Sequence, residues 1–191
     1  MSRRETILEA AEALFSHYGP AKTTISDIAK RSCVAVGAVY LEFRSKDQLL
    51  EAIASKAYAN IIVAMQSAAE LPRPYPERLT AVFEARVVAI RGHCSLGKHA
   101  SDLLHARYSA IHQAKQCYRE QQRDLLSTLL ADGKRAGELS FDDPDGAAES
   151  LLLAYMAFEP PWVFGFDASQ LVPTLQKLHV IVLRGLEHRS P

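Results

Sequence analysis

The stretch from Thr23 to Leu50, TTISDIAKRSCVAVGAVYLEFRSKDQLL, decides the fold. It contains two short helical patterns, over about residues 25–31 and 34–43, and then the start of a longer helix at about residue 45. The residues between the two short patterns are too few for anything but a tight turn. Two short helices joined in this way form a helix-turn-helix, whose second helix can lie in the major groove of DNA.

Capping signals mark where two of these helices begin. Thr24 and Asp27 match the capping-box pattern, in which the side chains at the N-cap and at the third helical position each bind the other residue's backbone N–H group. Ser45 and Gln48 repeat this pattern at the start of the longer helix. Both helix starts are therefore predicted from local residues alone.

Residues 1–50 resemble the TetR family of bacterial transcription regulators. The resemblance rests on ILEAAEALFSHYG from Ile7, TTISDIA from Thr23, and V-x-x-G-x-V-Y-x-x-F-R-S-K-D-Q-L from Val34. It implies an all-α fold with a three-helix DNA-binding unit over residues 1–46. It further implies a helical ligand-binding and dimerisation domain over residues 47–191.

The turn and the second short helix depart from the family pattern. The family commonly has glycine where this chain has Cys33, and serine where it has Ala35; cysteine at positive φ carries a steric cost, and alanine cannot cap a helix. The surface offered to base edges is mostly apolar and comprises Ala35, Val36, Ala38 and Leu41, while Gly37 lets the backbone approach closely. Apolar groups contact thymine methyl groups but make no bidentate hydrogen bonds to guanine or adenine. We therefore expect specificity from methyl contacts, phosphate positioning and DNA shape.

Phosphate contacts are expected from residues on both sides of the turn. The resemblance implies this role for Thr24, Tyr40 and Lys46, although an aromatic packed in the core is an alternative for Tyr40 and a solvated helix start is one for Lys46. Arg3 and Arg4 either reach toward phosphates or a minor groove, or form a solvated basic tail.

Composition indicates an ordinary globular protein. Hydrophobic residues make up 48% of the 191 residues, and 22 Lys and Arg balance 22 Asp and Glu. Residues 1–50 hold seven basic and six acidic side chains, so DNA affinity must come from the placement of charge and from dimerisation. Three widely spaced cysteines favour a reduced, cytoplasmic protein. Neither a signal peptide nor a membrane span is expected.

Apolar residues at helical spacing predict the remaining helices. These are expected at about residues 3–18, 45–70, 77–92, 98–106, 109–136, 144–158 and 169–188. A small-molecule pocket is expected between the long helices, with candidate lining residues Met65, Phe83, Val87, Tyr108, His112 and Trp162. The resemblance implies a four-helix dimer interface, with candidates Leu151, Leu152, Tyr155, Leu171, Leu175, Leu178 and Val182. Packing inside one chain is the alternative for these apolar stripes.

Histidines gather in the middle of the chain. His93, His99, His105 and His112 are spaced six, six and seven residues apart, which matches no compact zinc motif, so we expect no metal and no other cofactor. Polar helix faces or pocket lining explain these histidines equally well. Catalytic constellations and phosphate-binding glycine loops are not recognised, which disfavours an enzyme.

Together these features predict a ligand-responsive transcriptional regulator. The expected form is a homodimeric repressor that binds a pseudopalindromic double-stranded DNA operator and is released by a small, largely apolar molecule. The alternative is an all-α small-molecule-binding protein or sensor with weak or lost DNA binding, given Cys33, Ala35 and Val36. The sequence leaves open the ligand, the operator and the choice between repression and activation.

Overall fold

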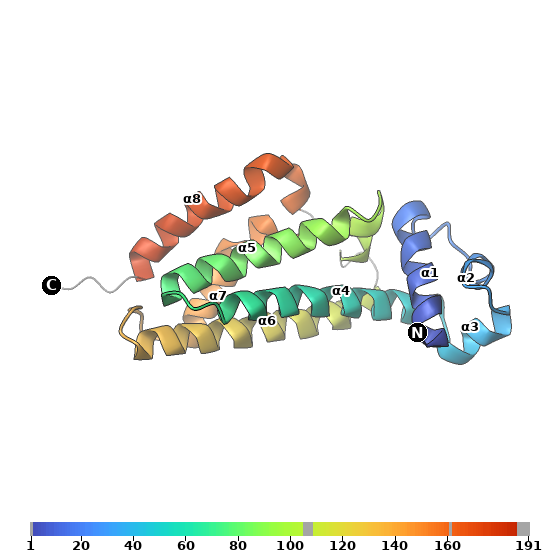
Figure 1. Cartoon of the computed structure of the whole chain (residues 1–191), viewed down its shortest axis with the longest axis horizontal. Coiled ribbons are helices and arrows are strands. Elements are labelled where there is room, and N and C mark those ends of the chain that lie inside the picture. The colour runs from blue at the N-terminus through green and yellow to red at the C-terminus, as the bar shows by residue number, and fades with distance from the viewer. Residues whose placement is uncertain (1, 105–108, 161, 187–191) are drawn as a thin grey trace. The chain divides into compact units, whose positions relative to one another are not determined.

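The computed structural model describes residues 2–104, 109–160 and 162–186, which form α-helices and 3-10 turns and no β-strand. The α-helices are α1 (Arg3–Tyr18), α2 (Ile25–Arg31), α3 (Val36–Glu42), α4 (Lys46–Ala69), α5 (Tyr75–Cys94), α6 (Ser109–Arg135), α7 (Pro144–Ala154) and α8 (Ala168–Leu186) (Figure 1). The 3-10 turns are η1 (Ala100–Leu103), η2 (Met156–Phe158) and η3 (Trp162–Gly165). The predicted all-α fold is confirmed.

Two segments differ from the predicted helices. The segment predicted as a helix over residues 98–106 forms only the 3-10 turn η1 where it is described, because the backbone N–H of His99 donates to the Ser16 carbonyl of α1 (2.9 Å) and not to a helical partner. The helix predicted to reach residue 158 stops at its C-cap, Tyr155, and continues as the tighter turn η2. Glu159 then takes an extended conformation, which is what a residue preceding proline prefers.

The chain divides into two compact units. The first unit comprises Met1–Ala59 and Arg91–Tyr118, and the second comprises Asn60–Ile90 and Arg119–Pro191. The functional boundary between residues 46 and 47 stays a prediction. None of the helices in the described ranges is long and apolar enough to cross a membrane.

The first unit is held together by a core to which five elements contribute. Its fully buried side chains come from α1, α2, α3, the start of α4 and η1: Ile7, Ala11, Phe15, Ile28, Ala29, Val39, Leu49, Leu50, Ile53 and Leu103. Phe43, just after α3, completes this core at 1% exposure. A seven-residue helix such as α3 is too short to be stable alone, so its position depends on the burial of Val39 and Phe43.

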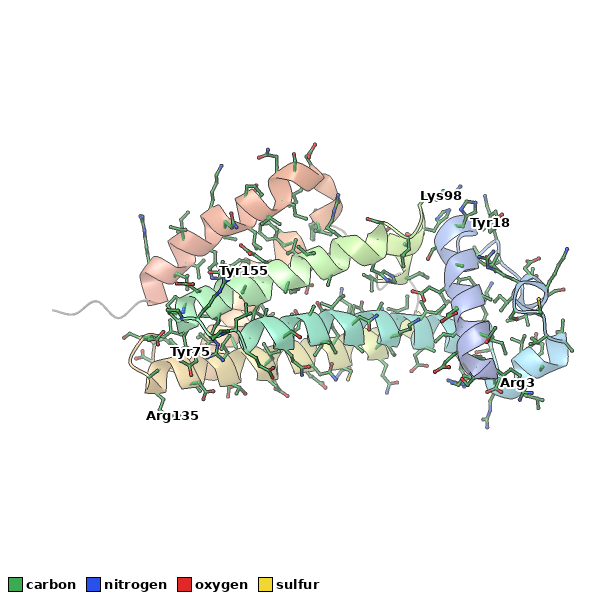
Figure 2. The ribbon with its side chains drawn as sticks, in the orientation of Figure 1. Arg3, Tyr18, Tyr75, Lys98, Arg135 and Tyr155 are labelled. Atoms are coloured by element: carbon green, nitrogen blue, oxygen red, sulfur yellow. The ribbon has the colours of Figure 1, made fainter. Side chains whose placement is uncertain are left out.

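In the second unit, α5 contributes a continuous apolar face to the core. Leu79, Val82, Phe83, Val87 and Ile90 are all buried along one face of this helix. A hydrogen bond from Gln176 to Glu84 (2.7 Å) joins α8 to α5. Tyr155, at the end of α7, lies against both of these helices (Figure 2), since it stacks on Phe83 and bonds to His179.

Candidate nucleic-acid interface and ligand-recognition residues

The turn between α2 and α3 is a Schellman motif with cysteine at the position that glycine normally takes. The Val34 N–H donates to the Ala29 carbonyl (3.0 Å) and the Cys33 N–H to the Lys30 carbonyl (3.3 Å), which are the two hydrogen bonds of this motif. Cys33 has φ of 54°, in the left-handed region that L residues with a Cβ avoid. The predicted positive φ at Cys33 is confirmed.

Helix α3 begins without a side-chain cap. Its N-cap residue, Ala35, has the extended conformation of an N-cap (φ −68°, ψ 148°) but makes no side-chain hydrogen bond. By contrast, Thr24 caps α2 through the predicted capping box, accepting from the Asp27 N–H while Asp27 accepts from the Thr24 N–H. The start of α3 is therefore stabilised less than the start of α2.

The outer surface of α3 is mainly apolar. Val36 is 42% exposed and Leu41 79% exposed, and Tyr40 is the exposed polar side chain between them at 51%. A Cβ added to Gly37 would meet no atom within 4 Å, so packing does not require glycine there. Because glycine in a helix costs about 1 kcal/mol relative to alanine, the fold gives no reason for Gly37. Its lack of a side chain suits close approach of a partner to the backbone.

Two arginines of α1 hold the end of α3. Arg3 forms an ion pair with the Glu42 carboxylate (2.8 Å). Arg4 donates to the Glu42 carbonyl (2.6 Å), and its guanidinium lies 4.1 Å from the centre of the Phe43 ring. Arg3 and Arg4 therefore do not form the solvated basic tail that the sequence allowed as one alternative. Their cations stabilise the carbonyl end of α3, where positive charge is favourable.

The three residues predicted to contact phosphate differ in the hydrogen bonds that they still have available. Thr24 donates its hydroxyl proton to the Asp27 carboxylate (2.6 Å), and the half-buried Lys46 ammonium donates to the carbonyls of Pro20 (2.9 Å) and Thr23 (3.4 Å). An ammonium has three donors, so one N–H of Lys46 remains for a phosphate. The Tyr40 hydroxyl has no partner in the described part of the chain. These assignments stay predictions.

Exposed cations near the turn were not among the predicted site residues. Lys22, Lys30, Arg31 and Arg44 are exposed and form no ion pair with any side chain that the structure describes. Lys22, Lys30 and Arg31 line one surface groove of the first unit, together with Asp27. A hydrogen bond from Thr24 lowers the pKa of the Asp27 carboxyl, so this groove contains one fixed negative charge among three positive ones.

The predicted ligand-binding residues occupy dissimilar environments. Met65, Phe83 and Val87 are fully buried in the second unit, whereas Trp162 in the same unit is 63% exposed. His112 is exposed and belongs to the first unit, and Tyr108 lies outside the described residues. A groove of about 470 Å³ in the second unit has other lining residues, among them Gln66, Arg78, Asp124 and Leu125.

A buried polar cluster in the second unit was not predicted. It comprises Phe83 and Arg86 of α5, Tyr155, Glu159, and His179 of α8. The side chain of Arg86 is fully buried and forms an ion pair with Glu159, while the Tyr155 hydroxyl hydrogen-bonds Nδ1 of His179. The sequence did contain a signal for this cluster, because Arg86 and His179 each interrupt an apolar helical stripe.

The predicted dimer residues divide between the interior and the surface. Leu151, Tyr155, Leu171 and Leu175 are buried within the second unit, and Leu152, Leu178 and Val182 are half-buried. Neighbouring apolar side chains are more exposed: Leu153 at 62%, Met156 at 49%, Val180 at 51% and Ile181 at 70%. Sequence periodicity selected the stripes but did not separate their inward and outward residues.

The described histidines do not assemble into a metal centre. His93 lies 3.9 Å from Glu12, and His99 lies 3.1 Å from Asp102, in two separate pairs. Within the described ranges, which leave out His105, groups of three potential ligands are absent. Burial lowers the pKa of His93, which favours its neutral form.

A short exposed helix follows a tight turn, is held by a packed helical core and is flanked by exposed cations without a described ion pair. These features define a helix-turn-helix DNA-binding protein. Residues 7–53 match the family model described as bacterial regulatory proteins, tetR family. The N-terminal part of the chain is therefore a DNA-binding domain of the TetR family of transcriptional regulators.

Similarities to known proteins extend beyond the DNA-binding unit. The HTH-type transcriptional regulator YhgD of Bacillus subtilis is 25% identical, with 97% of each chain covered. The HTH-type transcriptional repressor KstR2 of Mycolicibacterium smegmatis is 27% identical over 74% of this chain and 71% of the relative. The structure of a SmeT–triclosan complex, SmeT being a Stenotrophomonas maltophilia repressor, superposes with a TM-score of 0.76 at 22% identity, covering 100% of this chain and 94% of the other.

Proposed function

We propose that this regulator is a homodimeric repressor that binds a pseudopalindromic operator through α3 and is released by a small, largely apolar molecule. The exposed face of α3 carries the proposal, because the buried Val39 and Phe43 fix this helix with Val36, Tyr40 and Leu41 outward. One seven-residue helix reads few base pairs, so two-fold symmetry is the natural way to obtain an operator of useful length. The expected spacing of the half-sites is one helical turn of DNA, about 34 Å, or a multiple.

We assign phosphate affinity to cations that form no ion pair with a described side chain. Lys30 and Arg31 at the end of α2 are exposed, as is Arg44 after α3. Each phosphate contact releases condensed counterions, so the logarithm of the binding constant falls with the logarithm of the salt concentration by about 0.9 per contact. Tyr40 and the remaining N–H of Lys46 are proposed to add two further contacts.

The dimer surface is assigned to the exposed apolar residues of the second unit. Four apolar side chains are at least 49% exposed, namely Leu153, Met156, Val180 and Ile181. Covering them with a second copy of the chain would remove their apolar surface from water, which is favourable. A ligand releases the operator only if it binds more tightly to the form whose two α3 helices do not fit successive major grooves. The family relationship supports this arrangement, and the similar SmeT structure contains triclosan.

The test is selection of bound duplexes from a random pool, followed by mobility shifts over a range of salt concentrations. The expected winner is a two-fold symmetric site. The Lys30→Gln and Arg31→Gln variants each remove one phosphate contact per subunit, so each should reduce the salt slope of the dimer by about 2. Arg73→Gln is the matched control, since it removes an exposed cation from the second unit. An asymmetric winner would contradict the homodimer.

A second candidate function is a small-molecule sensor with weak DNA binding. The strained Cys33 and the uncapped Ala35 favour it, because both weaken the start of the reading helix. Absence of any enriched duplex at low salt would support this candidate over the repressor.

A further inference from the structure

The buried polar cluster of the second unit combines an aromatic wall with two pairs of polar groups. Phe83 and Tyr155 stack with ring centres 4.1 Å apart, and the His179 ring lies 5.9 Å from Phe83 and 5.6 Å from Tyr155. Phe83, Arg86 and Tyr155 are fully buried, and His179 is 2% exposed. Such a set costs much free energy to bury unless each polar atom is satisfied.

The hydrogen bond between Tyr155 and His179 fixes the tautomer of the imidazole. Burial raises the pKa of the Tyr155 phenol and lowers the pKa of His179 to about 4, so both groups are neutral near pH 7. The Tyr155 hydroxyl makes no other hydrogen bond with a described residue, so its O–H donates to Nδ1, and this leaves the ring proton on Nε2. His179 thus presents an Nε2–H donor.

This donor lacks an acceptor in the part of the chain that the structure describes. Nε2 of His179 is buried and makes no hydrogen bond with a described residue. Leaving a buried donor unsatisfied is unfavourable, and native proteins rarely do so. A bound molecule or a buried water is therefore expected to supply the acceptor.

The charges of the cluster limit what that molecule can be. Arg86 and Glu159 form an ion pair, so their charges cancel, and His179 adds none. An anionic ligand would enter without an excess positive charge to compensate its loss of hydration. An uncharged acceptor, such as a ketone, ester or lactone carbonyl, avoids this cost. The aromatic rings of Phe83, Tyr155 and Phe158 suit an apolar body attached to it.

We propose that His179 Nε2–H is the polar recognition point of the ligand site, and that it binds the uncharged carbonyl oxygen of a small, mainly apolar molecule. The proposal rests on the proposed function only in that the second unit takes a small molecule. Binding can be measured without DNA, so its failure is distinguishable from the failure of operator binding.

The test uses three probes with the same butylphenyl body: 4-butylacetophenone, 4-butylbenzoate and butylbenzene. Their binding to the full-length chain is measured by calorimetry at pH 7.5. His179→Asn keeps an acceptor for Tyr155 near the position of Nδ1 but removes the Nε2 donor, whereas His179→Gln places an amide N–H near Nε2. Circular dichroism and thermal unfolding confirm that both variants fold.

The ketone is expected to bind about tenfold more tightly than butylbenzene, which is the usual effect of one neutral buried hydrogen bond. His179→Asn should abolish this difference and His179→Gln should retain part of it. The imidazole nitrogen resonances of the wild-type chain should report an Nε2–H tautomer whose signal shifts with the ketone.

Three results would overturn the proposal. The first is that the ketone fails to bind at millimolar concentration or binds no better than butylbenzene, which would mean that a buried water alone satisfies Nε2. The second is equal ketone affinity in the wild-type chain and His179→Asn. The third is tighter binding of the benzoate, which would mean that an anion displaces Glu159 from Arg86.

Discussion

Replacing Cys33 with glycine should stabilise the protein, because the turn before α3 requires a left-handed residue. Cys33 has φ of 54°. A residue with a Cβ in this region costs roughly 1–2 kcal/mol, and glycine does not bear this cost. Against this gain, glycine lowers the free energy of unfolding by about 0.4–1 kcal/mol, because it gives the unfolded chain more conformational freedom. The thiol is exposed, so little burial is lost, and the net gain should be about 1 kcal/mol.

Urea unfolding followed by circular dichroism measures this gain as a shift in midpoint at constant slope. A thermal scan should show a midpoint higher by roughly 2–4 °C if the chain unfolds as one cooperative unit. Cys33→Ala is the matched control, since it removes the thiol and keeps the Cβ. Its stability should equal that of the wild-type chain.

The comparison of these two variants decides whether the reasoning is correct. If Cys33→Gly is no more stable than Cys33→Ala, then backbone strain at this position does not weaken the native state. If both variants gain equally, the thiol itself is unfavourable and the Schellman motif is not the cause.

Three further changes have predicted outcomes. Ala35→Ser should add about 1 kcal/mol to the free energy of unfolding by capping α3, whereas Ala35→Val should add nothing, as measured by urea unfolding. Arg4→Ala should lower the free energy of unfolding by about 0.5–1 kcal/mol in the same assay, because the contacts with Glu42 and Phe43 are lost. Equal stability of this variant and the wild type would show that these contacts do not stabilise α3. Burial holds the pKa of His179 at about 4, below its ordinary 6.5. Between these two pH values His179 is therefore protonated in the unfolded chain and neutral in the folded chain. Stability measured against pH should therefore fall by up to about 3 kcal/mol between pH 6.5 and pH 4 and level off below, and His179→Asn should lack this contribution.

The sequence predicted most of the fold because its strongest signals are local. The capping box at Thr24 and the apolar spacing along α1, α4 and α6 depend on near neighbours, and these helices form as predicted. The failure at η1 has a long-range cause. There the N–H of His99 bonds to Ser16, and a Cβ at Gly97 would lie 2.4 Å from the same carbonyl. A contact across some eighty residues leaves no periodic pattern.

The candidate sites were less predictable for the same reason. The contacts of Arg3 and Arg4 with Glu42 join α1 to α3, whereas the sequence suggested either a DNA contact or a solvated basic tail for these two residues. Tyr155 was predicted at a dimer surface because its apolar stripe is visible, yet the structure places its hydroxyl on His179. Periodicity identifies which residues are apolar, and only packing decides which partner each one meets.

In and around α3, the stability of the helix and its selectivity for bases depend on different residues. Cys33 and Ala35 act on the backbone before the helix, Val39 and Phe43 anchor it from the inside, and Val36 lies on the outer face. A change at Cys33 alters how often the helix is formed, and this affects every DNA sequence alike. Cys33→Gly should therefore raise operator affinity without changing the order of preferred bases. A substitution at Val36 should change that order, because we expect its side chain to contact the base edges. Band shifts on a set of operator variants separate the two effects. A changed order of preference in the Cys33→Gly variant would show that the turn contributes to base recognition.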